Sequence, residues 1–333
     1  MMTSMSELRI DLHGHAGRCF LAGLPAGHQL IATMGPAAVA DALRAAQAAG
    51  MTAVNLSAVA DFAVLRPDPA QGLRAHRDFR PGEAYADYRR QLTGIRQAAA
   101  EAGAEVATSA AGLERAARDG RTVVLLGCEG ADFLDGDLRR LEEARADGVT
   151  MLTLVHYRVN ELGDVQTEAP VHGGLSRLGR DVVAECNRLG IVIDCAHASF
   201  DTTMAVLEES SQPVIISHGQ LGHDGADANH PRLMTSGHAT AVAARGGLIG
   251  AWPCGFTSSS FDDFASEILR LTEAAGPDRV AIGTDLDGNY HPVLTSYPQL
   301  ADLACLLEDR GLPTADVERI LGGNALDLLT RVL

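Results

Sequence analysis

The sequence predicts a (β/α)8 barrel, an α/β fold of the TIM type, with an insertion after the second strand. Short runs of β-branched and aliphatic residues alternate along the chain with Ala-, Leu- and Arg-rich stretches of helical pattern. Several runs are almost entirely apolar, which is typical of parallel strands buried on both faces. Eight such strand–helix units predict a closed barrel, with a doubly wound open sheet as the structural alternative.

The expected strands are eight short segments, at 8–13, 52–57, 122–127, 150–155, 191–196, 213–218, 247–252 and 279–284. Helical patterns between them lie at 37–50, 138–148, 177–190 and 264–276, and each ends on a glycine, the residue favoured just after a helix. The segment 61–120 is the insertion; it carries its own helix at 83–103 and room for one more strand. The segment 219–235 is expected to be a polar loop.

Length and composition indicate one soluble globular domain spanning 1–333. The chain is 46% hydrophobic and 21% charged, with a formal net charge of −16 and no cluster of Lys and Arg, so nucleic acid is excluded as a partner. No window is apolar enough for a membrane span, and the first residues lack the pattern of a signal peptide. The six cysteines show no CxxC motif, which favours reduced thiols and a cytoplasmic location.

Polar residues capable of binding metals follow the expected strands where each strand ends. They are His13, His15, Glu129, His156, His197, His218 and Asp285. In a barrel these carboxyl ends converge on one mouth, where active sites lie. Imidazoles and carboxylates are the usual ligands of zinc-like ions, and this set exceeds one tetrahedral site. It predicts a pair of ions bridged by a carboxylate. A single histidine at a strand end is more often structural, so the prediction depends on the whole set.

The first strand presents its two histidines in RIDLHGHAG, with His13 and His15 two residues apart. Alternate residues of a strand share a face, so both point into the barrel if the strand continues through Gly14 and if Ile10 and Leu12 point outward toward helices. In the alternative, the strand ends at His13 and His15 only caps the next loop. Six other histidines lie in expected loops or helices and are taken as non-ligands: His28, His76, His172, His223, His238 and His291.

The chain resembles the membrane (renal) dipeptidase family of metallopeptidases, within the amidohydrolase-like, metal-dependent hydrolase barrels. The motifs that carry the resemblance, in order, are EG at 129–130, LTLVH at 152–156, GLSRLGRDVVAECNRLGIVID at 174–194, DCAHAS at 194–199, PVIISH at 213–218, HPR at 230–232, GTDLDG at 283–288 and GGNAL at 322–326. Each motif is weak by itself, but their number and order are specific. The family has Asp where this chain has His15, a change that removes one negative charge.

The resemblance implies two zinc ions, with another divalent metal as the alternative. His13 and His15 would hold one ion, His197 and His218 the other, and Glu129 would bridge them. The resemblance further implies that His156 faces the substrate carbonyl and stabilises the oxyanion. Asp285 would handle the proton of the attacking water, and Arg232 would bind the substrate's free carboxylate; taken without the resemblance, Arg232 is equally well a loop salt bridge.

We therefore expect a metal-dependent dipeptidase that acts on a small dipeptide-like substrate and is compatible with a homodimer. The residues alone fit hydrolysis of an amide, an ester or a lactam. One alternative is another amidohydrolase, acting on an N-acyl amino acid, a lactam or a biosynthetic intermediate. A second is a catalytically silent barrel with a binding role. A sugar-phosphate barrel enzyme is a weaker alternative, because no convincing Gly-rich phosphate loop follows the last two strands.

Overall fold

Eight parallel strands close into a barrel in the computed structural model, which describes residues 8–68, 72–222 and 230–333. The strands are β1 (Ile10–Asp11), β2 (Ala53–Val59), β6 (Val123–Glu129), β7 (Val149–Thr153), β8 (Val192–Asp194), β9 (Ile215–Gly219), β10 (Leu248–Ala251) and β11 (Val280–Ile282). The ring closes because β1 pairs with β11 and β2, and β2 pairs along its whole length with β6. The predicted barrel is confirmed, and the open-sheet alternative is wrong.

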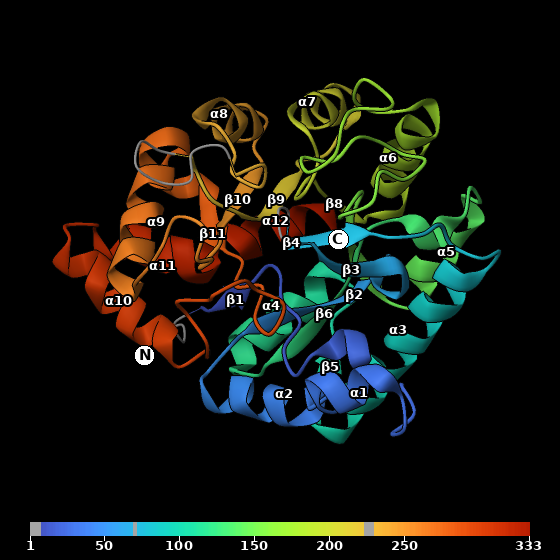
Figure 1. Cartoon of the computed structure of the whole chain (residues 1–333). Coiled ribbons are helices and arrows are strands. Elements are labelled where there is room, and N and C mark those ends of the chain that lie inside the picture. Colours follow the sequence, from blue (N-terminus) through green and yellow to red (C-terminus); the bar gives the residue numbers. More distant parts are fainter. Residues whose placement is uncertain (1–7, 69–71, 223–229) are drawn as a thin grey trace.

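Helices surround the barrel, and α4 (Ala110–Asp119) and α12 (Asn324–Val332) lie near the middle of the view (Figure 1). Those following the strands are α1 (Gln29–Met34), α2 (Val39–Ala48), α3 (Glu83–Glu101), α5 (Arg139–Ala146), α6 (Arg177–Leu189), α7 (Phe200–Glu209), α8 (Ser236–Ala244), α9 (Phe261–Ala275) and α10 (Gln299–Asp309). The chain then runs through α11 (Thr314–Glu318) and a π-helical turn (Arg319–Gly323) into α12 (Asn324–Val332), which packs on α4 (Ala110–Asp119).

Local sequence explains where these helices begin and end. Serine or threonine side chains accept a main-chain N–H at the start of five helices, namely Ser109, Ser176, Ser199, Thr235 and Ser260. The four glycines expected to follow helices, Gly50, Gly148, Gly190 and Gly276, all have positive φ. A left-handed residue at that point costs glycine nothing, so the chain can leave the helix there.

The insertion after β2 contains more elements than expected, because α4 and a short hairpin lie within 61–120 in addition to the predicted helix and strand. The helix predicted at 83–103 is α3, and the extra strand is β5 (Glu105–Val106), which pairs with the first residues of β6. A hairpin of β3 (Leu65–Asp68) and β4 (Gly72–Ala75) also forms and was not predicted. Pro67 lies inside β3, and proline removes a donor from the ladder, so sequence patterns disfavour a strand there.

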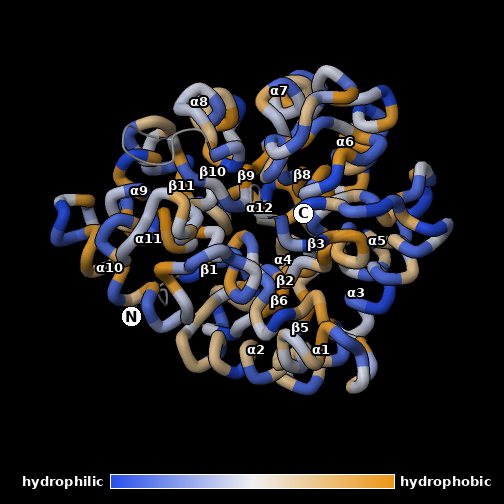
Figure 2. The backbone as a smooth tube through the Cα atoms, in the orientation of Figure 1, coloured by the Kyte–Doolittle hydropathy of each residue, from blue (hydrophilic) through white to orange (hydrophobic). Residues whose placement is uncertain are grey.

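Apolar side chains fill the amino-terminal half of the barrel, and the carboxyl-terminal end is polar. One buried cluster contains side chains from all eight barrel strands together with α4 and α12, so it occupies the barrel interior. A larger cluster lies between the strands and the outer helices. Hydrophobic segments correspondingly gather along the strands, with hydrophilic ones toward the periphery (Figure 2). Ile10 and Leu12 belong to the interior cluster, so the expectation that they face outward is wrong.

The structure bears on two of the predictions about the whole chain, those on membrane-spanning segments and on cysteines. None of the helices among the described residues is both long and apolar enough to cross a bilayer. All six cysteines are free thiols, and five of them are buried. The single domain over 1–333, the cytoplasmic location and the homodimer stay predictions. The polar loop expected at 219–235 lies partly outside the described residues, which resume at 230.

Candidate metal centre

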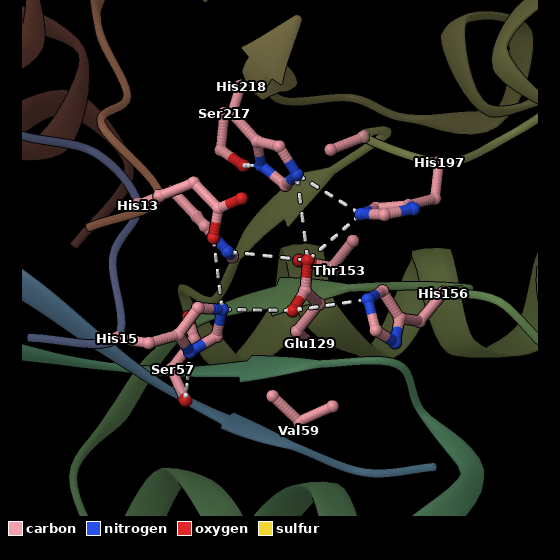
Figure 3. A network of polar contacts seen from close by, with 12 residues as sticks. His13, His15, Ser57, Val59, Glu129, Thr153, His156, His197, Ser217 and His218 are labelled. Carbon is pink, nitrogen blue, oxygen red and sulfur yellow. Dashed lines mark hydrogen bonds and ion pairs between the residues drawn. The ribbon is translucent and has the colours of Figure 1, made fainter. Parts of the chain in front are cut away.

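Five histidines surround the carboxylate of Glu129 at the carboxyl-terminal end of the barrel (Figure 3). Glu129 is the last residue of β6 and is only 2% exposed. Its Oε1 lies 3.3, 3.0 and 3.6 Å from the Nε2 atoms of His13, His197 and His218. Its Oε2 lies 3.2 and 3.4 Å from the Nε2 atoms of His15 and His156. The strand-end residues predicted from sequence therefore meet at one point.

His13, His15 and Glu129 form the first donor group, whose potential ligand atoms all lie within 4.8 Å of one another. The regular strand ends at Asp11, but the chain stays paired on both sides through Gly14, which bridges to Leu286. Leu12 still points into the barrel interior, so the change of direction after it turns both histidines toward Glu129. Neither sequence alternative described this irregular stretch, although both histidines do reach the centre.

Glu129, His197 and His218 form the second donor group, with potential ligand atoms again within 4.8 Å of one another. His197 follows β8, where its φ of 65° places it in the left-handed region that non-glycine residues rarely adopt. His218 lies within β9. The two Nε2 atoms face each other at 3.1 Å. Strained backbone of this kind persists where the surroundings hold it, often at functional sites.

Hydrogen bonds fix which nitrogen of two histidines carries the proton. Nδ1 of His15 lies 3.0 Å from the main-chain oxygen of Ser57, which can only accept, so this nitrogen donates. Nδ1 of His218 lies 3.0 Å from Oγ of Ser217, whose own proton goes to Asp194 at 2.6 Å. In the neutral form of both rings, Nε2 is thus left with a lone pair directed at the centre. This is the orientation that metal-binding histidines require.

The donor set fits metal ions better than it fits a closed network of hydrogen bonds. Lone pairs of imidazole nitrogens and carboxylate oxygens all converge, and Nε2 of His13 is buried without a hydrogen-bond partner among the described residues. Acceptors that face one another repel unless a cation lies between them. Nitrogen and carboxylate ligands suit zinc, and two overlapping groups joined by one carboxylate suit a pair of ions.

The histidine pKa values of the two groups shift in opposite directions. In the first group, burial would lower the pKa of His15, but its contacts with Cys19 and Glu129 outweigh burial and raise that pKa. Burial lowers the pKa of His197 well below its ordinary range, with the Arg232 charge acting in the same direction. Burial also lowers the pKa of His218, aided by His13. Burial by itself would raise the pKa of Glu129. The nearby His156 and His13 outweigh burial and hold that pKa well below its usual range. The second group therefore presents neutral imidazoles beside an ionised carboxylate.

Asp285 lies beside the first donor group. Its Oδ1 is 3.4 Å from Nε2 of His15, and burial raises its pKa above the ordinary value. The residue has a φ of 51° and donates its main-chain N–H to the oxygen of His13. A Cβ on Gly288 would lie 2.4 Å from Cδ2 of His15 and 2.7 Å from Oδ1 of Asp285, so only glycine fits in this turn.

His156 is held by a carboxylate on the side away from Glu129. Its Nδ1 donates to Oδ1 of Asp61 at 2.7 Å, and the other oxygen of Asp61 accepts the N–H of Tyr157. Burial alone would lower the pKa of His156, but the charges of Asp61 and Glu129 outweigh it and raise that pKa. An imidazole of this kind keeps an Nε2 proton that it can donate toward the centre.

Arg232 reaches the second donor group from the loop that follows β9. It is 3% exposed, and one of its NH2 groups lies 3.3 Å from Nε2 of His197. The other terminal nitrogen donates to Oε1 of Gln166, and Nε has no hydrogen-bond partner among the described residues. A buried guanidinium with a spare donor next to a metal-ligand set is suited to bind an anion.

Comparison with known proteins supplies the family. The model of the membrane dipeptidase family, peptidase family M19, matches residues 34–332. The chain belongs to the membrane dipeptidase family. Glu129, Arg232 and Asp285 lie within the matched segment, whereas His13 and His15 precede it. The family is one of metallopeptidases, which agrees with the donor groups of the structure.

Among curated relatives, dipeptidase tcpJ of Claviceps purpurea is 30% identical over 240 residues, covering 68% of this chain and 55% of the relative. Dipeptidase aclJ of Aspergillus oryzae is 32% identical over 220 residues, covering 63% and 51%. The chain thus spans about half the length of the curated relatives it matches.

Solved structures of family members share the fold. The dipeptidase AC structure of family M19 superposes with a TM-score of 0.80 at 21% identity, covering 97% of this chain and 98% of the other. A Rhodobacter sphaeroides metallopeptidase, solved with a phosphinate mimic of the dipeptide L-Ala-D-Ala, gives 0.79 at 20% identity, with coverages of 98% and 99%. At such identities the likeness establishes the barrel fold.

The remaining histidines were predicted not to bind metal, and two residues that contact the centre were not predicted. His28, His76, His172, His238 and His291 belong to neither donor group, and His223 lies outside the described residues. Asp61 and Trp252 contact the centre but were not predicted. A usable signal existed, because Asp61 follows the end of β2 and Trp252 follows the end of β10. Applying the strand-end criterion to every strand, and to aromatic residues, would have found both.

Proposed function

We propose that this chain is a metal-dependent dipeptidase that hydrolyses the amide bond of a dipeptide at a pair of divalent ions, with zinc as the expected metal. One observation carries the proposal: two donor groups share the Glu129 carboxylate beside the buried guanidinium of Arg232. A paired metal site matches hydrolysis, and a cation next to it matches a substrate with a free carboxylate.

The roles of the residues follow from their positions. His13 and His15 would hold one ion, His197 and His218 the other, and Glu129 both. Bound ions supply Lewis-acid polarisation of the scissile carbonyl and lower the pKa of water. Arg232 binds the substrate carboxylate through Nε and a terminal nitrogen, which places the amide bond at the centre.

Two further residues handle charge and protons. Nε2 of His156 donates a hydrogen bond to the oxygen of the carbonyl as negative charge develops on it, and Asp61 keeps the ring oriented for this. Asp285 accepts the proton of the attacking water at Oδ1 and passes it to the leaving amine. The raised pKa of Asp285 suits a group that must first accept and then release a proton.

The test is a substrate panel on protein stripped of metal and then loaded with Zn²⁺. We expect hydrolysis of a dipeptide such as Ala-Gly in the loaded protein only. The C-terminal amide of the same dipeptide should be cut far more slowly, since a buried Arg without its anion is costly. Turnover of N-acetylglycine but not of the dipeptide would favour the other amidohydrolase. Absence of metal-dependent turnover on every substrate would favour the silent barrel.

A further inference from the structure

Trp252 contacts three groups of the proposed active site at once. Its indole Nε1–H donates to Oδ2 of Asp285 at 3.2 Å. The Cζ of Arg232 lies 5.0 Å from the ring centroid, within the range of a cation–π contact. The ring also meets His218 edge to face, with centroids 5.3 Å apart. Trp252 is the only tryptophan of the chain, and it is 3% exposed.

The backbone around Trp252 leaves the ring little freedom. The residue directly follows β10, and its N–H donates to the main-chain oxygen of Gly219 at the end of β9. A second ring, that of Phe256, meets the indole at a centroid distance of 5.6 Å. A buried aromatic side chain fixed on a strand end is a rigid support, because few alternative rotamers fit in a packed environment.

We propose that Trp252 is a positioning residue that sets the distance between the substrate's carboxylate and the group that transfers the proton. Arg232 on its face would hold the carboxylate, and Asp285 at its N–H would serve the amide nitrogen. In an α-dipeptide one carbon atom separates these two parts of the substrate. In a dipeptide that ends in a β-amino acid, two carbon atoms do. A rigid indole between the two residues therefore selects the α-linked substrate class. This inference rests on the proposed function.

The two contacts of Trp252 can be removed in two steps. Trp252→Phe keeps an aromatic face for Arg232 but has no N–H for Asp285. We expect kcat on Ala-Gly to fall roughly 10–100-fold, as for loss of a hydrogen bond to a charged group, with KM changed less than about threefold. Trp252→Leu removes the face as well, so KM should also rise and the preference for Ala-Gly over Ala-β-Ala should shrink. A merely structural role would not separate kcat from KM in this way.

The matched control is Phe264→Leu. Phe264 is a fully buried aromatic residue of α9 that packs in the outer core cluster, away from the metal centre, so this variant should keep the wild-type preference for Ala-Gly over Ala-β-Ala. If Trp252→Phe and Trp252→Leu both retain wild-type kcat and the same preference, the inference is wrong. If wild-type protein cuts no dipeptide at all, the proposed function fails instead.

The single tryptophan gives a second measurement that needs neither turnover nor a variant of Trp252. Acetate should change the fluorescence of the wild-type protein, because a carboxylate bound by Arg232 alters the charge over the indole. Acetamide, an uncharged molecule of the same shape, should not. The response to acetate should vanish in Arg232→Met. If it persists there, the carboxylate acts on the metal ligands rather than on the Arg232–Trp252 pair, and the coupling is contradicted.

Discussion

The two donor groups share Glu129 but differ in how their histidines are held and in the charge beside them. In the first group, His15 is oriented by a main-chain oxygen, that of Ser57. In the second, His218 is oriented by a side chain, Ser217, which Asp194 supports in turn. A carboxylate, Asp285, lies beside the first group, whereas the guanidinium of Arg232 lies beside the second.

Because of this difference, two ions bound at the Glu129 carboxylate would not be equivalent. An extra carboxylate attracts a divalent cation, and a nearby guanidinium repels one, in a buried site where screening is weak. The first ion should therefore be held more tightly than the second, and a chelator should remove the second ion first. Binding of a substrate carboxylate at Arg232 would also change the affinity mainly for the second ion, because Arg232 lies beside the second group. Substitutions at four residues test this comparison.

Glu129→Gln should have the largest effect, because both groups lose their shared charged ligand. We expect the variant to bind neither ion tightly and its turnover to fall to that of metal-stripped wild type. The measurement is metal content by mass spectrometry after dialysis, with kcat on Ala-Gly. Should the variant retain both ions, Glu129 does not bridge the two groups.

His15→Ala should empty the first group alone. The protein should keep one ion after dialysis against a weak chelator, while His15→Asp should keep two, because carboxylate can replace imidazole at zinc. Metal content per chain distinguishes these outcomes. Two tightly held ions and full activity in His15→Ala would show that only His13 and Glu129 serve the first ion.

Asp285→Asn should still bind both ions but should lower the rate of the chemical step. Removing the proton acceptor should lower kcat on the order of 10²–10⁴-fold, the usual contribution of a general acid–base group. The first ion should also become easier to remove, since a negative charge next to it is gone. Circular dichroism and metal content provide the controls. Near-wild-type kcat would remove Asp285 from the proposed mechanism.

Ser217→Ala should have the smallest effect and act on the second group only. The substitution removes the oxygen that accepts the Nδ1 proton of His218, and loss of such a supporting contact typically costs about 10–100-fold in metal affinity. Competition with a fluorescent chelator would measure it. An equal loss at both ions would mean that the groups are not independently supported, which contradicts the comparison.

The sequence was most informative where chemistry and periodicity coincide. Apolar runs alternating with helical patterns predicted the eight strands, and each of the five helix patterns corresponds to a helix of the structure. Polar residues at strand ends predicted the members of both donor groups, because parallel strands of a barrel must end at one mouth. The hairpin β3–β4 was missed because of Pro67. Proline disfavours a strand within a main sheet, but this hairpin lies outside the barrel sheet.

The amino-acid pattern was therefore enough to identify which residues gather at the mouth of the barrel, whereas the way these residues face one another depends on how the chain folds. The period of two in RIDLHGHAG could not show that the strand breaks after Asp11, because Ile10 and Leu12 are apolar in either phase. Nor could it show that Asp61 supports His156 or that Trp252 joins Arg232 to Asp285. Those contacts join residues far apart in the chain, and no local preference encodes them; they exist because closing the barrel brings the ends of different strands together.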